Sequence, residues 1–409
     1  MKKYLSLLLV ALFFFFHLPV YASLGPIHVK VGSTASTIPL SSDGGLLQNG
    51  NPIGNSFLAT VQNVSEDDIF SSTQGYVRIG GKPYRGSVRF IKAGGQLHSV
   101  NIVDVEDYIR GVLPKEIGTS TPIEALKAQA VISRSFAYAN WNKFQKYGYN
   151  LDDSTASQVY AGMSVESAMT DRAVYETKGQ VLYYQGNVAN TIFHATSGGE
   201  TEAIEDVWGG NPLPYLKAIK DPYSLNTRNA TWTATLSASE ISKAFPSVGR
   251  PTFLQVLARS STGRITSMAV VGTTGREMVT GNQFRMKLGS IKIKSTNFGT
   301  ELPGESIAKP TMVMTANGVK PYANQNRITA SGIKEASSIA ILRGNGKRDR
   351  KEPSVYDKEI MTIADTITLN GRGYGHGVGL SQYGAIEMAK SGMDYRAILA
   401  FYYPGTDLK

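Results

Sequence analysis

No cysteine occurs anywhere in the 409 residues of this chain, and its absence limits what can hold the fold together. It removes disulfide bonds, thiolate nucleophiles, iron–sulfur clusters and every zinc site that uses cysteine. The length is enough for one large domain or two ordinary ones, each with a hydrophobic core. With 42% hydrophobic and 18% charged residues, the composition excludes a wholly disordered or collagen-like chain.

The first 22 residues have the pattern of a secretory signal peptide. Lys2 and Lys3 precede an apolar run over residues 4–16, and Val20 and Ala22 suit cleavage after Ala22. An uncleaved membrane anchor is the alternative, although about 13 apolar residues are short for a span of about 20. No cysteine follows the run, so a lipoprotein is excluded. We therefore expect an exported protein.

The chain is basic, with a formal net charge of +10. Loss of Lys2 and Lys3 with the signal peptide leaves about +8. Most of this charge belongs on a solvated surface, and the excess suits a polyanionic matrix such as cell-wall polymers. No basic helix and no aromatic RNA-binding motif occurs, so we expect no nucleic-acid partner.

Alternating and helical patterns together predict an α+β fold. Short alternating stretches, such as residues 27–31 and 87–91, make the N-terminal part β-rich. Helices are predicted over 105–113 (ending before Pro114), 121–144, 166–177 and 238–245, with two more short helices near the C-terminus. A hairpin is predicted over 180–196 and a strand over 362–369.

These patterns divide the chain into five parts. They are a signal peptide (1–22), a β-rich N-terminal segment (23–79), a helical core with hairpins (80–229 and 359–409), an inserted β-rich subdomain (230–300) and a polar, loop-rich insert (301–358).

The helix over 121–144 has a clear predicted start and two unusual cations. Thr121 is the predicted N-cap, followed by Pro122 in the first turn and Glu124 three residues after the cap. Lys127 and Arg134 lie beside the apolar stripe rather than opposite it. They either snorkel at the edge of the core or line a cleft that admits a polar substrate, and periodicity alone does not separate the two.

Glu116 is a candidate for a general acid. It stands between Pro114 and Gly118, next to Leu113 and Ile117. Burial on a stiff turn would raise the pKa of this carboxyl and suit a general acid. A surface glutamate on a loop is the plainer alternative. The short connection from Gly118 leads us to expect Lys127 and Arg134 in the same cleft as Glu116.

Two later motifs combine histidine, hydroxyl groups and glycine. In residues 193–201, His194 precedes Ser197 and a glycine pair, an arrangement that can orient a polar ligand or bind a metal. A Ser-His hydrolase is disfavoured because Gly-x-Ser-x-Gly is absent. Residues 371–382 place His376 among alternating glycines, without the spacing of a nucleotide-binding loop. Such glycines allow close approach to a bound chain or a tight crossing in the core.

Metal binding has little support in the sequence. Outside the signal peptide the histidines are His28, His98, His194 and His376, and no His-Glu-x-x-His spacing occurs. Three histidines would satisfy zinc by count alone. We expect no metal and no other cofactor.

Seven motifs in one order resemble those of the stage II sporulation protein D (SpoIID) family, which includes the LytB-type amidase enhancers. They are residues 104–116, 124–137, 157–162, 193–199, 206–210, 371–384 and 402–406. The resemblance is strong over 80–235 and 362–409, moderate over 26–79 and 236–300, and nearly absent over 303–358.

The resemblance implies a peptidoglycan lytic transglycosylase. Such an enzyme cuts between N-acetylmuramic acid and N-acetylglucosamine, leaves a 1,6-anhydro end and favours denuded glycan, which has lost its stem peptides. It implies that 80–229 with 359–409 is the catalytic domain, that Glu116 is the catalytic acid and base, and that Lys127 and Arg134 bind substrate. Weaker substrate-binding candidates in the matched motifs are His194, Ser197, His376, Gln382, Tyr402 and Tyr403. Some relatives have a zinc site with cysteine beside the His-x-Thr-Ser segment, and Ser197 with no cysteine argues against that metal here.

Two alternatives remain open at this point. A hydrolase would need a second carboxylate, for which Asp152, Asp153, Glu205 and Asp206 are candidates. A non-enzymatic protein would instead bind the wall and enhance an N-acetylmuramoyl-L-alanine amidase. Every version predicts a bacterial protein that is secreted, in the cell wall or at the outer face of the cytoplasmic membrane, with glycan strands as its partner.

Overall fold

The computed structural model describes residues 24–302 and 359–409, together with the backbone of six short strands between them. The chain divides into two compact units. The N-terminal unit runs to Thr191 and includes Thr406–Lys409, and the C-terminal unit is Ile192–Gly405. The predicted signal peptide lies outside the described residues. Within these residues, none of the helices has the length and apolar character needed to span a membrane.

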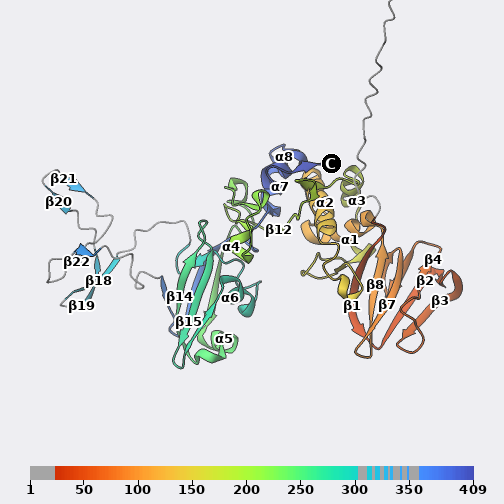
Figure 1. Cartoon of the computed structure of the whole chain (residues 1–409), viewed down its shortest axis with the longest axis horizontal. Coiled ribbons are helices and arrows are strands. Elements are labelled where there is room, and N and C mark those ends of the chain that lie inside the picture. Colours follow the sequence, from red (N-terminus) through yellow and green to blue (C-terminus); the bar gives the residue numbers. More distant parts are fainter. Residues whose placement is uncertain are drawn as a thin grey trace, which may run out of the picture. The chain divides into compact units, whose positions relative to one another are not determined.

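A nine-stranded sheet forms most of the N-terminal unit (Figure 1). Its strands are β1 (Ile27–Ala35), β2 (Thr37–Gln48), β3 (Asn51–Thr60), β4 (Phe70–Ser72), β5 (Tyr76–Ile79), β6 (Lys82–Arg85), β7 (Ser87–Ala93), β8 (Gln96–Val103) and β9 (Leu151–Asp152). The order across the sheet is β6-β5-β2-β4-β7-β8-β1-β9, and β3 pairs with β2. The pairs are antiparallel except for β1 with β9.

Alternation along the strands selects the face that carries the core. Val29, Val31 and Phe90 are buried, and they share one core with Tyr108 and Leu126 of the helices. The helices of this unit are α1 (Val105–Ile117), α2 (Ile123–Ala139) and α3 (Ala168–Glu176). Figure 1 shows them gathered beside one end of the sheet. A small sheet of β11 (Asn187–Val188), β10 (Leu182–Tyr184) and β27 (Asp407–Leu408) completes the unit.

The C-terminal unit has its own apolar core, centred on Phe245, Phe284 and Phe298. Its strands are β12 (Phe193–His194), β13 (Thr231–Ser237), β14 (Pro251–Arg259), β15 (Ile265–Gly272), β16 (Arg276–Val279), β17 (Phe298–Gly299), β24 (Ile360–Thr362), β25 (Thr366–Arg372) and β26 (Leu380–Ser381). Its helices are α4 (Ile204–Trp208), α5 (Ala238–Ala244), α6 (Gly281–Leu288), α7 (Gln382–Lys390) and α8 (Tyr395–Tyr402). The strands form three sheets, β12-β26, β13-β25-β17 and β16-β15-β14-β24.

Short strand pairs occupy part of the stretch predicted to be loop-rich. They are β18 (Thr311–Thr315) with β19 (Gly318–Tyr322), β20 (Arg327–Thr329) with β21 (Gly332–Lys334), and β22 (Ile341–Leu342) with β23 (Arg348–Asp349). The α+β fold class is confirmed. The five-part division of the chain stays a prediction.

The first two predicted helices differ from the structure at their ends. Helix α1 continues through Pro114 to Ile117, so Glu116 lies in a helical turn rather than on a loop. The proline lacks an N–H and costs α1 one helical bond, but Gly118 N–H donates to Pro114 O at 3.2 Å and closes the last turn. The predicted cap of α2 is also wrong: Pro122 is the N-cap, and the Thr121 hydroxyl donates to Ile117 O at 2.7 Å.

The later helices agree better. Helix α3 begins at a capping box formed by Ser167 and Thr170, and α5 begins at one formed by Ser237 and Glu240. Helix α6 was not predicted, although Thr280 and Gln283 form a capping box there too. The local signal for this helix is therefore present within a stretch whose pattern predicts mostly strands.

Candidate functional site

Glu116 lies at the end of α1, where the helix stops at Gly118. The backbone of Gly118 has φ +82°, a conformation that favours glycine and ends the helix sharply. The side chain of Glu116 is partly exposed at this end. The carboxyl is therefore mostly enclosed by protein but open to a ligand.

One backbone N–H holds the Glu116 carboxylate. The Val159 N–H donates to Oε1 at 2.9 Å, and Oε2 makes no hydrogen bond within 24–302 and 359–409. Burial raises the pKa of Glu116, and the Val159 bond offsets part of that rise. A raised pKa increases the protonated fraction, which a general acid needs.

The residues around Val159 form a second motif that packs against α1. Gly111 O accepts a hydrogen bond from Ala161 N–H at 3.1 Å. A Cβ at Gly111 would lie 2.4 Å from the Tyr160 ring, so only glycine permits this approach. Residues 104–116 and 157–162, two motifs separate in the sequence, thus meet at Glu116.

Tyr108 lies in the same region, where the charges of two further carboxylates act on it. This buried phenol donates to Gln158 Oε1 at 3.3 Å. Burial raises the pKa of Tyr108, and the charges of Glu116, Asp152 and Asp153 raise it further. Both aspartates are partly held by other groups, since Asp152 Oδ1 accepts from the Ser154 hydroxyl and Asp153 Oδ2 from Gly32 N–H.

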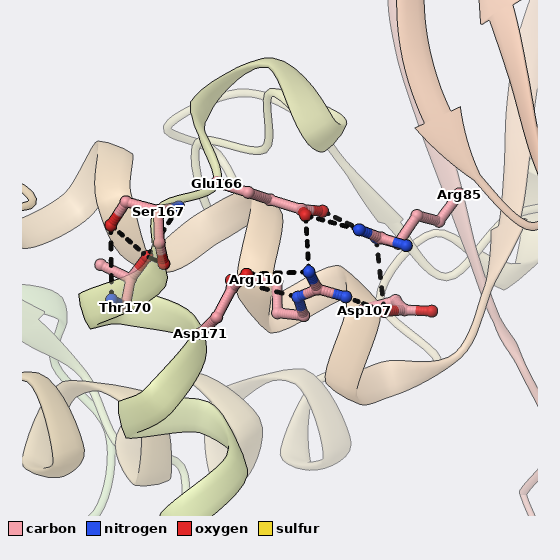
Figure 2. Close-up of polar contacts among 7 residues, drawn as sticks. All are labelled: Arg85, Asp107, Arg110, Glu166, Ser167, Thr170 and Asp171. Carbon is pink, nitrogen blue, oxygen red and sulfur yellow. Dashed lines mark hydrogen bonds and ion pairs between the residues drawn. The ribbon is translucent and has the colours of Figure 1, made fainter.

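A network of charged side chains fixes α1 between β6 and α3 (Figure 2). Arg85 makes two hydrogen bonds to Glu166, of 2.8 and 2.7 Å. Arg110 contacts Glu166 at 2.8 Å, Asp171 at 2.8 Å and Asp107 at 3.0 Å. Such forked arginine bonds constrain direction as well as distance, so they orient the helix that carries Glu116. The sequence did not single out these residues, because their spacing carries no recognisable pattern.

The expected cleft shared by Arg134 and Glu116 is not found. The Arg134 side chain is 0% exposed, and its guanidinium donates to Glu106 Oε1 at 2.9 Å, Glu106 Oε2 at 2.6 Å and Gln180 O at 2.9 Å. Glu106 stands ten positions before Glu116 on α1, or about 15 Å along the helix axis. The expectation is therefore wrong for Arg134. Its buried guanidinium pairs with Glu106, near the start of α1 rather than near Glu116.

Lys127 lies on α2 and faces two glutamates. Its ammonium group is 2.8 Å from Glu124 Oε1 and 2.6 Å from Glu176 Oε2. The bonds to Glu124 and then Glu176 raise the pKa of Lys127. The side chain is 15% exposed, so it joins α2 to α3 and does not extend into solvent. Its role in substrate binding stays a prediction.

In the C-terminal unit, His194 and His376 are neighbours. Their ring centroids are 5.6 Å apart, and the Trp208 ring lies 5.0 Å from that of His376. His194 Nδ1 and Val378 O lie 3.1 Å apart, and Val378 N–H donates to His376 Nδ1 at 3.1 Å. Burial lowers the pKa of His376 to about 3, with a contribution from the charge of Arg264. Both imidazoles are held neutral within the packing of this unit.

Ser197 belongs to a buried cluster of hydroxyl groups around Asp221. Its hydroxyl donates to Asp221 Oδ2 at 2.7 Å and lies 2.6 Å from Ser224 Oγ. Burial raises the pKa of Asp221. The Tyr402 hydroxyl lies near the same carboxylate. A Cβ added at Gly384 would lie 2.1 Å from that hydroxyl and 2.9 Å from Asp221 Oδ2, so both groups surround the position of Gly384.

The remaining predicted residues also lie inside this unit. Gln382 opens α7 and is 9% exposed. The Tyr403 hydroxyl donates to Ile192 O at 2.8 Å and accepts from Leu380 N–H at 3.2 Å. Burial raises the pKa of Tyr403. These contacts make Tyr403 a bridge between two strand ends.

Several known proteins are similar to this chain. The family described as stage II sporulation protein (SpoIID) matches residues 93–184. The amidase enhancer of Bacillus subtilis (strain 168) is 30% identical over 88% of this chain and 48% of its own length. An uncharacterized protein of Brachyspira hyodysenteriae (strain ATCC 49526 / WA1) is 30% identical over 84% of this chain and 77% of its own length. Stage II sporulation protein D of Bacillus subtilis (strain 168) is 28% identical over 76% of each chain.

The chain belongs to the SpoIID family. The match to 93–184 includes Glu116, Lys127 and Arg134, all in the N-terminal unit. Relative to the amidase enhancer, this SpoIID chain spans about half the length.

The glycine-rich segment of this SpoIID chain is a tight crossing. A Cβ at Gly198 would lie 2.5 Å from Gly373 N, and a Cβ at Gly379 would lie 1.9 Å from Ile192 O. Of the two sequence interpretations, the crossing in the core is therefore the one observed. Across 24–302 and 359–409, no group of three or more metal-ligating side chains is present.

A pocket of about 290 Å³ in the C-terminal unit includes Trp208, Asp206 and Arg264 in its lining. Arg264 is fully buried, and its Nη2 donates to Ser197 O at 3.1 Å. Its charge is balanced by buried Glu202, with Nε 3.8 Å from Glu202 Oε2. Arg264 and Glu202 were missed in the sequence, since neither belongs to a spacing motif.

Proposed function

We propose that this protein is a peptidoglycan lytic transglycosylase with Glu116 as its acid and base. The observation that carries the proposal is the state of the Glu116 carboxyl: enclosed enough for a raised pKa, held at Oε1 alone, and open at Oε2. A proton on Oε2 has no competing acceptor among the described residues, so it is available to a bound sugar.

The proposed reaction needs no second carboxylate. Protonated Glu116 donates its proton to the glycosidic oxygen as the bond from that oxygen to C1 of N-acetylmuramic acid breaks. The C6 hydroxyl of the same sugar then bonds to C1, and its proton returns to the Glu116 carboxylate. The products are a 1,6-anhydro end and a free 4-hydroxyl on N-acetylglucosamine, and the enzyme regains its starting state.

Mass spectrometry of denuded glycan after incubation with the protein tests this proposal. Anhydro-muramic ends that appear with the wild-type protein and disappear with Glu116→Gln would support it. Glu387→Gln is a matched control, because Glu387 is a partly exposed glutamate on α7 that forms an ion pair with Lys390. New reducing ends would instead identify a hydrolase, which requires a second carboxylate.

An enhancer of an N-acetylmuramoyl-L-alanine amidase is the second candidate. It is favoured by the likeness to the Bacillus subtilis amidase enhancer over 88% of this chain. In that case the protein would leave glycan unchanged by itself and would raise the rate at which an added amidase releases stem peptides. Both candidates place it outside the cytoplasm, in the cell wall or at the outer face of the membrane, in contact with glycan strands. A role in sporulation fits the same relatives.

A further inference from the structure

One pocket of the N-terminal unit lies on the nine-stranded sheet, and Glu116 is not among its lining residues. It has a volume of about 350 Å³, and its lining includes Lys30, Ile91, His98, Lys146, Tyr147 and Tyr149. We call it the sheet-face pocket. None of its lining residues contributes to the site around Glu116, and no acidic residue lines it.

Strand register explains why these side chains share one face. Lys30 of β1 pairs with Val100 of β8, and His98 of β8 pairs with Ile91 of β7. Residues that pair directly point to the same side of a sheet, so Lys30, His98 and Ile91 lie on the face away from buried Val29 and Phe90. The pocket is therefore built on the side of the sheet that does not carry the core.

A loop after α2 covers this face and supplies the aromatic wall. Gly148 has φ +85°, and a Cβ there would lie 3.1 Å from Ile91 Cδ1. Its carbonyl accepts a hydrogen bond from Arg89 on β7. The loop is thus fastened to the sheet in the structure, and the pocket is formed before any ligand binds.

Three rings in this loop form a single surface. Centroids of Phe144 and Tyr149 are 5.4 Å apart, and those of Tyr147 and Tyr149 are 6.3 Å apart with planes inclined by 25°. Tyr147 is 53% exposed, which leaves its ring open to a ligand. Flat apolar rings with a polar edge suit the apolar face of a sugar ring.

Two cations, Lys30 and Lys146, stand beside these rings. Neither forms an ion pair within 24–302 or 359–409, although Asp152 pairs with Lys30 in the sheet and the charge of Lys30 acts on Asp153. The Lys146 ammonium lies 4.8 Å from the centroid of Tyr147. Burial, and then the charge of Lys30, lowers the pKa of His98, so the lysines are the fixed charges here. The pocket therefore favours an anion next to the sugar ring.

We propose that the sheet-face pocket binds a pyranose that carries a free carboxylate. This rests on the proposed function, because in a glycan strand that sugar is N-acetylmuramic acid whose lactyl group has lost its stem peptide. Removal of the peptide exposes a carboxylate, whereas in an intact strand the same carbon is an amide without charge. The pocket thus distinguishes denuded from intact glycan by charge, at a place separate from Glu116. The rings favour a sugar over a polyol phosphate, which has no such face.

Calorimetric titration with soluble strands tests the pocket in a Glu116→Gln background, so that the glycan stays uncut. Tyr147→Ala and the double change Lys30→Gln with Lys146→Gln should each weaken binding of denuded strands about tenfold. Binding of intact strands should be unchanged by the double lysine change. Tyr175→Ala and Lys178→Gln are controls, since Tyr175 is 79% exposed and neither residue lines the pocket.

If the pocket variants bound denuded strands as tightly as the controls do, the proposal would be overturned. It would also be overturned if the double lysine change weakened binding of denuded and intact strands equally. Displacement of denuded strands by a glycerol phosphate polymer, abolished by the double lysine change, would show a phosphate site instead. Melting temperatures check that each variant is folded. The proposed function fails separately, if wild-type protein releases no anhydro ends while the binding differences remain.

Discussion

Two buried polar sites, one in each unit, balance their charges in different ways. At the N-terminal site, the buried Arg134 guanidinium is matched by the opposite charge of Glu106, as Arg264 is matched by Glu202 elsewhere in the C-terminal unit. In the C-terminal unit, Asp221 is surrounded by hydroxyl groups, and His194 and His376 are uncharged. The cause is the local supply of partners: helices α1 and α3 carry many charged residues, whereas the segments around Asp221 carry serine and glycine.

This difference separates residues that can react from residues that hold the fold. Glu116 is raised in pKa by burial yet has no cation or hydroxyl bonded to Oε2 among the described residues. Ser197 and Tyr403 already make hydrogen bonds within their own unit. A group whose bonds are satisfied must break them before it can bind substrate, and that raises the cost of a catalytic role.

The largest expected effect is on activity. Glu116→Gln removes the transferable proton but keeps an oxygen for the Val159 N–H, so the rate of anhydro-end formation should fall by about 10²- to 10⁴-fold. Mass spectrometry of reaction time courses measures the rate. Full activity of this variant would show that the acid lies elsewhere.

The next effect is on stability in the N-terminal unit. Arg134→Ala leaves the Glu106 carboxylate without its cation, and we expect the free energy of unfolding to fall by about 3–5 kcal/mol. Urea denaturation of the exported form measures it. Lys127→Ala should cost less, because Glu124 and Glu176 remain partly exposed to water. A folded, stable but inactive Arg134→Ala variant would restore a direct role in substrate binding.

A smaller change is expected in the C-terminal unit. Gly384→Ala places a methyl group against the Tyr402 hydroxyl and the Asp221 carboxylate, so stability should fall by about 1–3 kcal/mol. Glu387→Ala, at a partly exposed position of the same helix, should change little. Equal melting temperatures for Gly384→Ala and wild type would mean that this cluster adapts, against the rigid packing described above.

The pH dependence of stability gives a subtler test of Glu116. Because burial raises its pKa above the ordinary 4.5, the folded state holds this proton more tightly than the unfolded state does. The wild-type protein therefore loses stability as the pH rises from 4.5 through the raised pKa, and Glu116→Gln does not share that loss. The variant should become progressively more stable than wild type over this range, as thermal melts at several pH values would show. A constant difference would contradict the raised pKa.

The smallest expected effect is that of metal removal. Any activity on denuded glycan should survive dialysis against EDTA, because the proposed steps use only Glu116 and the sugar's own hydroxyl. Loss of activity that returns with zinc would reveal carboxylate ligands that the sequence analysis did not identify.

Local sequence signals identified most of the secondary structure and singled out Glu116 as a candidate. The sequence pattern predicted helices at the positions of α3 and α5, and alternation predicted strands at the positions of β1 and β7, because such patterns depend on residues a few positions apart. The neighbours of Glu116 made it a candidate general acid, and the family resemblance supplied the proposed role; its raised pKa agrees with the apolar residues next to it. Pro114 misled the prediction, since a single lost helical bond was outweighed by packing that continues α1 to Ile117.

The partners of charged groups were decided by tertiary structure. The sequence showed Arg134 beside an apolar stripe but could not show Glu106, 28 positions away, which meets it. It also gave no sign that residues 157–162 would approach Gly111 and supply the Val159 N–H to Glu116, 43 positions away. Periodicity specifies which face of an element is buried, because that depends on neighbours within one or two turns. Which charge meets which across the core depends on how distant elements pack, and only the folded chain fixes that.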